Sequence, residues 1–252
     1  MEQARAAAEA VENEDAIAAN LVNLSIVQHR IGERAAAIAS AERVLNERNL
    51  RFPVQRLAEA ALRLALLALE AGDPGTARKW TERAQSHCAD PCALRAKMLG
   101  VYASLAIAAG DAPGAERFAR EAVMLFRGRP EREELANGLR LLGVAATLRG
   151  EAVRGLAALA EALEIDKALA LPRAIANDLI ALGRAHASLG EASRARSFYE
   201  RAIAVASADG NLPSVALAKS ALAGLGESAA SERDPRGGDE ARLLQQMKGP
   251  SK

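Results

Sequence analysis

The sequence contains few of the residues that most often carry out chemistry. Among its 252 residues there are three histidines and two cysteines, and only 3% of the residues are aromatic. The histidines His29, His87 and His186 are widely separated, and no segment combines a nucleophile, a base and oxyanion donors. We therefore predict a protein that is not an enzyme and that uses neither a cofactor nor a metal ion.

The chain also lacks a large net charge and any long hydrophobic run. Its formal net charge is +1, which gives no global field to attract nucleic acid or an anionic membrane surface. The longest apolar stretches, such as ALRLALLALEAG (61–72), are too short and too interrupted to form a transmembrane segment. Half of the residues are hydrophobic and alanine is the commonest of them, so the core must be packed from small side chains.

One stretch, AGDPGTARK (Ala71–Lys79), contains the residue types of a phosphate-binding loop but not their spacing. A Walker loop has the form G-x-x-x-x-G-K-[ST] after a strand. Here Gly75 follows Gly72 after only two residues, and the preceding segment has helical periodicity. Thirty-eight residues later the chain contains AGDAPGAERF, which is nearly the same segment. The stretch is therefore interpreted as a turn in a repeat.

The turn glycine recurs along the chain with a period close to 40 residues. Each copy is followed by an acidic residue, and small residues stand five and twelve positions after it. The glycines are Gly32, Gly72, Gly110, Gly150 and Gly190. A glycine is suited to end one helix in a left-handed conformation, and an acid is suited to the positive start of the next helix. A fixed period of this length is typical of a helical solenoid.

The pattern predicts five antiparallel helix pairs, in which the small residues let the two helices approach closely. Prolines at the starts of four pairs fit this division, because a missing N–H does no harm at the first helical position. The expected pairs are 14–49, 53–88, 91–127, 131–169 and 172–208. Residues 211–227 repeat the first helix of a pair and are expected to form a C-terminal capping helix.

The segment LGRAHASLGEASRARSFYERAIAVA (Leu182–Ala206) resembles the tetratricopeptide repeat (TPR), with its Leu-Gly, small and aromatic positions in register. The period of about 40 residues is similar to that of the extended repeats in kinesin light chains and in bacterial TPR regulators and lipoproteins. The resemblance covers residues 13–227. It implies an all-α fold, a right-handed α-solenoid of about five TPR-like helix pairs, with about twelve helices in total.

Both ends depart from the repeat. Residues 1–12 are expected to form a lone helix, the second half of a pair whose first helix is absent. We interpret it either as the remnant of a trimmed protein from which a signal or anchor was removed, which we favour, or as a cap. Residues 228–252 are polar and are expected to form a mobile tail, with a short amphipathic helix at 239–248. The two end helices are complementary halves of a repeat, so head-to-tail self-association is an alternative.

The two cysteines lie at the junction between the second and third pairs. Cys88 and Cys92 form a disulfide, remain two free thiols, or bind a metal ion with His87; the last alternative lacks a fourth ligand nearby. A disulfide would imply an oxidising compartment. Together with the interpretation of a trimmed start, it slightly favours the bacterial periplasm or cell envelope over the cytoplasm.

The first helix of each pair is expected to line the concave face, where the resemblance to TPR proteins implies that a partner binds. In the extended-repeat relatives, asparagines on this face commonly hold the backbone of the ligand, and an asparagine can both donate and accept. Cations above an apolar floor suit an acidic peptide or a C-terminal carboxylate. The alternative is ordinary solvated helix surface. The candidate residues are Asn23, Arg63, Lys97, Asn137, Arg140, Val144, Asn177 and Arg184, centred on the fourth and fifth pairs.

These observations predict a non-catalytic adaptor or scaffold that binds a segment of a partner protein in its concave groove. The alternatives are the ligand-sensing regulatory domain of a larger signalling protein, and a structural protein that assembles head to tail. No nucleic acid is expected as a partner.

Overall fold

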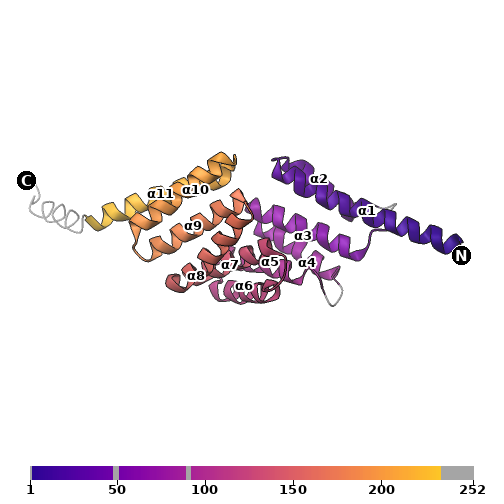
Figure 1. The fold of residues 1–252 in the computed structure, drawn as a ribbon, viewed down its shortest axis with the longest axis horizontal. Helices are drawn as coiled ribbons and strands as arrows, with labels where there is room; N and C mark the ends of the chain where they lie inside the picture. Colours follow the sequence, from indigo (N-terminus) through magenta and orange to yellow (C-terminus); the bar gives the residue numbers. More distant parts are fainter. Residues whose placement is uncertain (1, 48–50, 89–91, 234–252) are drawn as a thin grey trace, which may run out of the picture.

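The computed structural model describes residues 2–47, 51–88 and 92–233, and all regular elements within these ranges are α-helices (Figure 1). They follow one another as antiparallel hairpins, which confirms the predicted all-α solenoid. The helices are α1 (Glu2–Arg30), α2 (Arg34–Asn46), α3 (Val54–Glu70), α4 (Pro74–Ser86), α5 (Arg95–Ala108), α6 (Ala112–Phe126), α7 (Arg132–Leu148), α8 (Ala152–Ala168), α9 (Pro172–Ser188), α10 (Ala192–Ala208) and α11 (Leu212–Arg233).

The ends of the described chain differ from the prediction. Residues 1–12 were expected as a lone helix, but α1 runs without a break from Glu2 to Arg30, because ENEDAI at 12–17 contains no glycine or proline to end it. This merger accounts for one helix fewer than the twelve expected. At the other end α11 continues to Arg233, beyond the predicted limit of 227. The expected helix at 239–248 lies outside the described residues.

The predicted turn glycines all adopt left-handed backbone conformations. Gly150, between α7 and α8, has φ 79°; its N–H donates to the Thr147 carbonyl (3.0 Å), and the N–H of Glu151 donates to the Ala146 carbonyl (2.9 Å). These bonds satisfy carbonyls that the end of the helix leaves free, and a side chain would be strained at this φ. The other turns have the same form: Gly32, Gly72, Gly110 and Gly190, with φ from 73° to 87°.

The acid after each glycine begins the next helix, but only the aspartates cap it with their side chains. Asp73 accepts a hydrogen bond from the Thr76 N–H, and Asp111 from the Gly114 N–H, both at 2.9 Å. The glutamates at this position make no side-chain cap bond, because their longer side chains reach past the helix end: Glu33, Glu151 and Glu191.

Small residues stand where the two helices of a pair cross. Five positions after the turn glycine the alanines are fully buried, and so is the glycine that replaces one of them. The residues twelve positions after it are 0–1% exposed. The two sets are Ala37, Ala77, Ala115, Gly155 and Ala195, and Val44, Ala84, Ala122, Ala162 and Ala202. The predicted close packing of each pair is therefore present.

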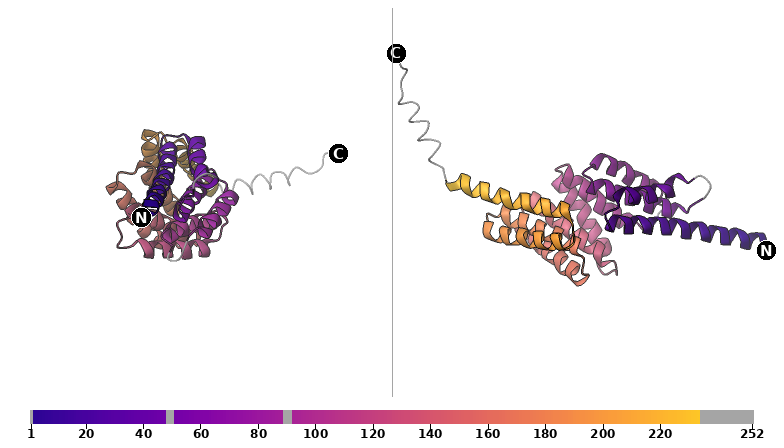
Figure 2. Two further views of the ribbon diagram at one scale, coloured as in Figure 1. Left: turned by 90° about the vertical axis from the view of Figure 1, so that its right-hand side faces the viewer. Right: turned by 90° about the horizontal axis from the view of Figure 1, so that it is seen from above.

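The first helices lie on the inside of the superhelix. Each of α1, α3, α5, α7 and α9 contacts the next odd-numbered helix, whereas within the described chain no second helix of a pair contacts another second helix. Seen along the long axis, the helices form a ring (Figure 2, left). Arg173 of α9 connects the two ends of this ring. Its Nη2 donates a hydrogen bond to the Arg30 carbonyl at the end of α1 (2.9 Å), 143 residues away in the sequence. The concave face is thus enclosed by one turn of the solenoid.

Replacing Gly143 by alanine is expected to destabilise the protein. A Cβ at this position of α7 would lie 2.5 Å from Leu159 Cγ and 2.9 Å from the Gly155 carbonyl of α8. We expect a loss of about 1–3 kcal/mol in the free energy of unfolding, measured with urea. The control is Gly224→Ala in α11, where nothing lies within 4 Å and the gain in helix propensity should be neutral or stabilising. Equal effects of the two variants would contradict the close crossing of α7 and α8.

Candidate functional site

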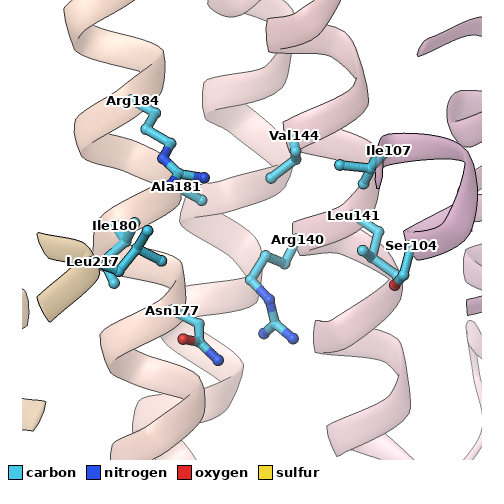
Figure 3. A pocket seen from close by; sticks show the side chains of 10 residues that line it. All are labelled: Ser104, Ile107, Arg140, Leu141, Val144, Asn177, Ile180, Ala181, Arg184 and Leu217. Carbon is cyan, nitrogen blue, oxygen red and sulfur yellow. The ribbon is translucent and has the colours of Figure 1, made fainter. Parts of the chain in front are cut away.

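A pocket of about 230 Å³ opens on the concave side between four first helices, α5, α7, α9 and α11 (Figure 3). Aliphatic side chains make most of its wall, and polar groups enter it from α5, α7 and α9. The lining residues are Ser104, Ile107, Arg140, Leu141, Val144, Asn177, Ile180, Ala181, Arg184 and Leu217. An apolar cavity with a few convergent polar groups is the usual form of a ligand-binding site.

The structure brings together four of the eight candidate groove residues: Arg140, Val144, Asn177 and Arg184. Leu217 was missed because α11 was treated only as a cap. A signal was present in the sequence, because Leu217 stands 40 residues after the candidate Asn177, at the same register position in the next first helix.

The other candidate cations already have partners outside this pocket. Lys97 Nζ lies 2.8 Å from Glu134 Oε1 of the neighbouring first helix. The Arg63 guanidinium donates to the hydroxyl and to the carbonyl of Ser25, both at 3.3 Å. Asn23 is exposed on α1 and does not line the pocket. The pocket lies at the fourth and fifth pairs, where the site is expected; that a partner binds there stays a prediction.

The guanidinium of Arg140 is bound by side chains that do not line the pocket. Its Nη2 donates to Asn137 Oδ1 (2.5 Å), and its Nη1 donates to Asp178 Oδ1 (3.3 Å). Asp166 Oδ2 of α8 lies 3.7 Å from the same Nη1. Asn137 was expected to face solvent and bind the partner's backbone; instead its carbonyl fixes Arg140. Its amide nitrogen is 3.4 Å from where a side chain at Gly100 would begin.

Two buried aspartates, Asp166 and Asp178, therefore face Arg140. Neither aspartate was predicted from the sequence. Asp178 is 0% exposed and Asp166 is 1% exposed. The register contained a signal. Asp178 stands where earlier first helices have Ala60, Met98 and Gly138, and Asp166 stands where neighbouring second helices have Phe126 and Ala206. Because the neighbouring repeats have buried nonionic residues at these two positions, an acid at both indicates a polar cluster inside the array.

The pKa of Asp178 is raised to about 7, chiefly by burial; Arg140 opposes the rise, and the nearby Asp166 adds to it. Burial also raises the pKa of Asp166, against the effects of Asp178 and Arg140. Three carboxylate oxygens, both of Asp166 and Oδ2 of Asp178, have no hydrogen-bond partner while both groups are ionised. One proton placed between the two carboxylates supplies the missing donor.

Arg184 is the pocket cation that no acid neutralises. It is exposed on α9, and within the described chain it makes no ion pair or hydrogen bond. Asn177, two turns earlier on the same helix, accepts a hydrogen bond from the Ser214 hydroxyl (3.3 Å), which leaves its amide N–H groups available. In Figure 3 the side chains of Arg184 and Asn177 border the same space as Arg140 and Val144. The arrangement offers one free positive charge and one amide above an aliphatic floor.

A second hollow on the opposite, α6 side of the array is rich in arginine but largely neutralised. Glu116, 4% exposed, binds Arg120, Arg149 (2.6 Å) and Arg154 (2.8 Å). These arginines hold the pKa of Glu116 below its usual range even though burial acts in the opposite direction. A carboxylate so surrounded ties α6 to α8 and leaves little free positive charge for a ligand.

The structure joins Cys88 and Cys92 in a disulfide, with their Cα atoms 5.3 Å apart. This geometry corresponds to the first of the three alternatives for the cysteine pair. His186 is 8% exposed, stacks on Phe198 and bonds to Glu191 Oε2 (2.5 Å), so it packs inside the array. Among the described residues no group of three or more metal-ligating side chains occurs. No helix in the same ranges is long and apolar enough to cross a membrane.

Comparison with known proteins identifies the fold and not a specific relative. No family model and no curated protein matches the sequence. Several solved TPR structures are similar: a Rap protein complexed with Competence and Sporulation Factor (TM-score 0.68, 13% identity) and a thermophilic TPR protein of Thermus thermophilus (0.55, 21%). A third is a putative kinesin light chain of Podospora anserina with TPR-like repeats (0.51, 17%).

The shares of each chain that align differ. The alignments cover 82%, 81% and 74% of this chain, and 58%, 98% and 93% of the three others, in the same order. This chain thus spans less than two thirds of the Rap protein. The shared feature is the array of helix pairs, and the protein is a TPR-type α-solenoid.

Removing the charge of Asp178 should alter how stability depends on pH. The folded protein keeps a proton on Asp178 up to about pH 7, whereas an unfolded aspartate releases it near 3.8. The unfolded state therefore binds fewer protons in this window, and stability falls as the pH rises through it. We expect Asp178→Asn to abolish roughly 2 kcal/mol of the decrease in unfolding free energy between pH 5 and pH 8.

Urea denaturation at both pH values measures this difference. Asp209→Asn is the matched control, because Asp209 forms only a peripheral ion pair with Arg173 at 3.2 Å and should leave the decrease unchanged. Identical pH profiles for the wild type and Asp178→Asn would show that the two buried carboxylates do not share a proton.

Protein produced in an oxidising compartment should contain the Cys88–Cys92 disulfide. Counting thiols on unreduced, denatured material should give none, and reduction should lower the unfolding free energy by about 2 kcal/mol in the chain-entropy model for a short loop. The double variant Cys88→Ser/Cys92→Ser serves as the control that reductant must not affect. Two free thiols in the unreduced protein would contradict the bond.

Proposed function

We propose that this protein is a non-catalytic adaptor that binds a segment of a partner protein in its concave groove, with the pocket between α5, α7, α9 and α11 as the anchoring point. The observation that carries the proposal is Arg184, a cation at the edge of an apolar pocket that no acid among the described residues neutralises. In a helical solenoid the concave face is the extended surface that commonly binds a partner.

The chemistry of the pocket favours a carboxylate next to an aliphatic side chain. Val144, Ile180 and Leu217 offer apolar contact, and the guanidinium of Arg184 is suited to a carboxylate in a bidentate arrangement. The free amide N–H groups of Asn177 are suited to a backbone carbonyl of an extended peptide. Arg140 contributes less directly, because Asn137 and Asp178 already hold it.

The solved structures support the class of function. The Rap protein with a similar fold is, by its description, complexed with Competence and Sporulation Factor, so a solenoid of this kind accommodates a bound partner. We infer the same use of the fold here. The identity of the partner is not part of the inference.

The experiment is a selection of random peptides displayed on phage against the immobilised protein, followed by affinity measurements on the selected peptides. Selected sequences should be enriched in Asp, Glu or a free C-terminus beside Leu, Ile or Val. Arg184→Ala should weaken their binding about tenfold or more, the effect of losing one charge-assisted hydrogen bond where water is excluded.

The matched control is Arg196→Ala, which removes an exposed arginine of α10 outside the pocket and should leave binding unchanged. Asn177→Ala should give an intermediate loss of affinity. If Arg184→Ala binds the selected peptides as tightly as the wild type does, the pocket is not the binding site.

A further inference from the structure

The buried carboxylate pair lies directly against a residue of the pocket. Arg140 lines the cavity with one side of its side chain, and its Nη1 is 3.3 Å from Asp178 and 3.7 Å from Asp166. With both aspartates ionised, these three groups carry one net negative charge, and three buried oxygens lack donors. With one proton on the pair, the cluster is neutral and the two carboxylates can hydrogen bond to each other.

The charge of this cluster acts on whatever occupies the pocket. A ligand carboxylate at Arg184 approaches the positive side of Arg140 and, beyond it, the two aspartates. When the cluster is neutral, it exerts no net repulsion on the ligand, and the charge of Arg184 attracts the ligand carboxylate. When the cluster carries a negative charge, that charge repels the ligand, and because both aspartates are buried, salt screens it less than it screens a surface charge.

We propose that the pocket binds its carboxylate ligand together with one proton held between Asp166 and Asp178, so that loss of this proton weakens binding. The inference rests on the proposed function, since it assumes that a carboxylate enters this pocket. It adds a mode of regulation, in which a buried switch between the fourth and fifth helix pairs makes ligand binding depend on pH.

The neighbours of the pair define the pH range and the direction. Among the groups that face it, α7 supplies Arg140, which stabilises the ionised forms, and Glu133, which acts weakly on Asp166 in the opposite direction. From α10 the titratable group against α9 is Tyr199, which burial keeps neutral in this range. Because the Asp178 carboxyl titrates at about pH 7, affinity should be high below neutrality and lower above it.

The test uses full-length protein and two simple probes, N-acetyl-L-leucine and its uncharged analogue N-acetyl-L-leucinamide. The first combines one aliphatic side chain with one carboxylate that stays ionised from pH 5.5 to 8. Its affinity, measured by NMR titration, should fall roughly fivefold to tenfold between these pH values, the size expected for charges about 10 Å apart at an effective dielectric of about 20–40. The affinity of the uncharged probe should change little.

Two isosteric variants isolate the pair. Asp178→Asn and Asp166→Asn each leave a single aspartate opposite Arg140, so the cluster carries no net negative charge at any pH, and the fall in affinity of the charged probe between pH 5.5 and 8 should largely disappear. If Asp178→Asn does not fold, Asp166→Asn keeps the Arg140–Asp178 hydrogen bond and still provides the test. Calorimetry near pH 7.5 in buffers of different ionisation enthalpy should show proton uptake by the wild type alone.

The outcomes separate this inference from the proposed function. Binding of N-acetyl-L-leucine that is equal at pH 5.5 and 8 overturns the proton coupling and leaves the carboxylate pocket standing. A pH dependence that persists in both variants also overturns it, because another group, such as the His186–Glu191 pair, then causes the change. No binding of the charged probe at either pH contradicts the carboxylate pocket itself, and the coupling with it. Carboxyl ¹³C signals of both aspartates that titrate below pH 5 would overturn the shared proton directly.

Discussion

The close approach of the two helices within each pair is the constraint on which the rest of the molecule depends. Five positions after each turn glycine the residue at the crossing is alanine or glycine, and a single added methyl group at Gly143 would overlap Leu159 and the Gly155 backbone. Backbones this close fix the angle of each hairpin, because there are no long side chains to adjust. The angle repeats in successive pairs and so generates the superhelix. A core of this kind needs few aromatic residues, which is consistent with their scarcity in the chain.

The superhelix in turn decides which side chains can meet a ligand. First helices lie on the inside, and side chains from four of them converge on one small cavity. Several charges on this face form ion pairs between neighbouring repeats, such as Lys97 with Glu134 (2.8 Å) and Arg140 with Asp178 (3.3 Å). Arg184 is different because the residues around it are aliphatic. Selectivity for a carboxylate would thus arise because Arg184 has no acidic neighbour in the described chain. An acidic side chain beside it would form an ion pair with the guanidinium and so take the place of a ligand carboxylate.

The fold followed from the sequence because its determinants are local and repeat at every turn. Three features recur at each turn: a glycine that can adopt a left-handed conformation, an acid at the start of the next helix and small residues at fixed offsets. Each indicates the same helical hairpin, and all five turns have them. The site could be predicted only in part. Asn137 and Asn177 occupy equivalent positions, yet Asn137 binds Arg140 (2.5 Å) and Asn177 borders the cavity. Equivalent register cannot distinguish them, because the difference lies in neighbours from other repeats. For the same reason the repeat pattern does not predict the hydrogen bond between Arg173 and the end of α1.

The buried aspartates stand at two positions where the neighbouring repeats have nonionic residues that pack in the core. An apolar residue at either position would avoid the cost of desolvating a carboxylate, and replacing buried ion clusters by hydrophobic residues is often stabilising in proteins. Arg140 alone does not compensate, because one guanidinium cannot satisfy four carboxylate oxygens, three of which have no partner. A shared proton removes most of this cost without removing the polarity. Stability alone therefore does not account for the pair. Its position against a pocket residue, in the part of the array that carries the free cation, connects this local cost to binding.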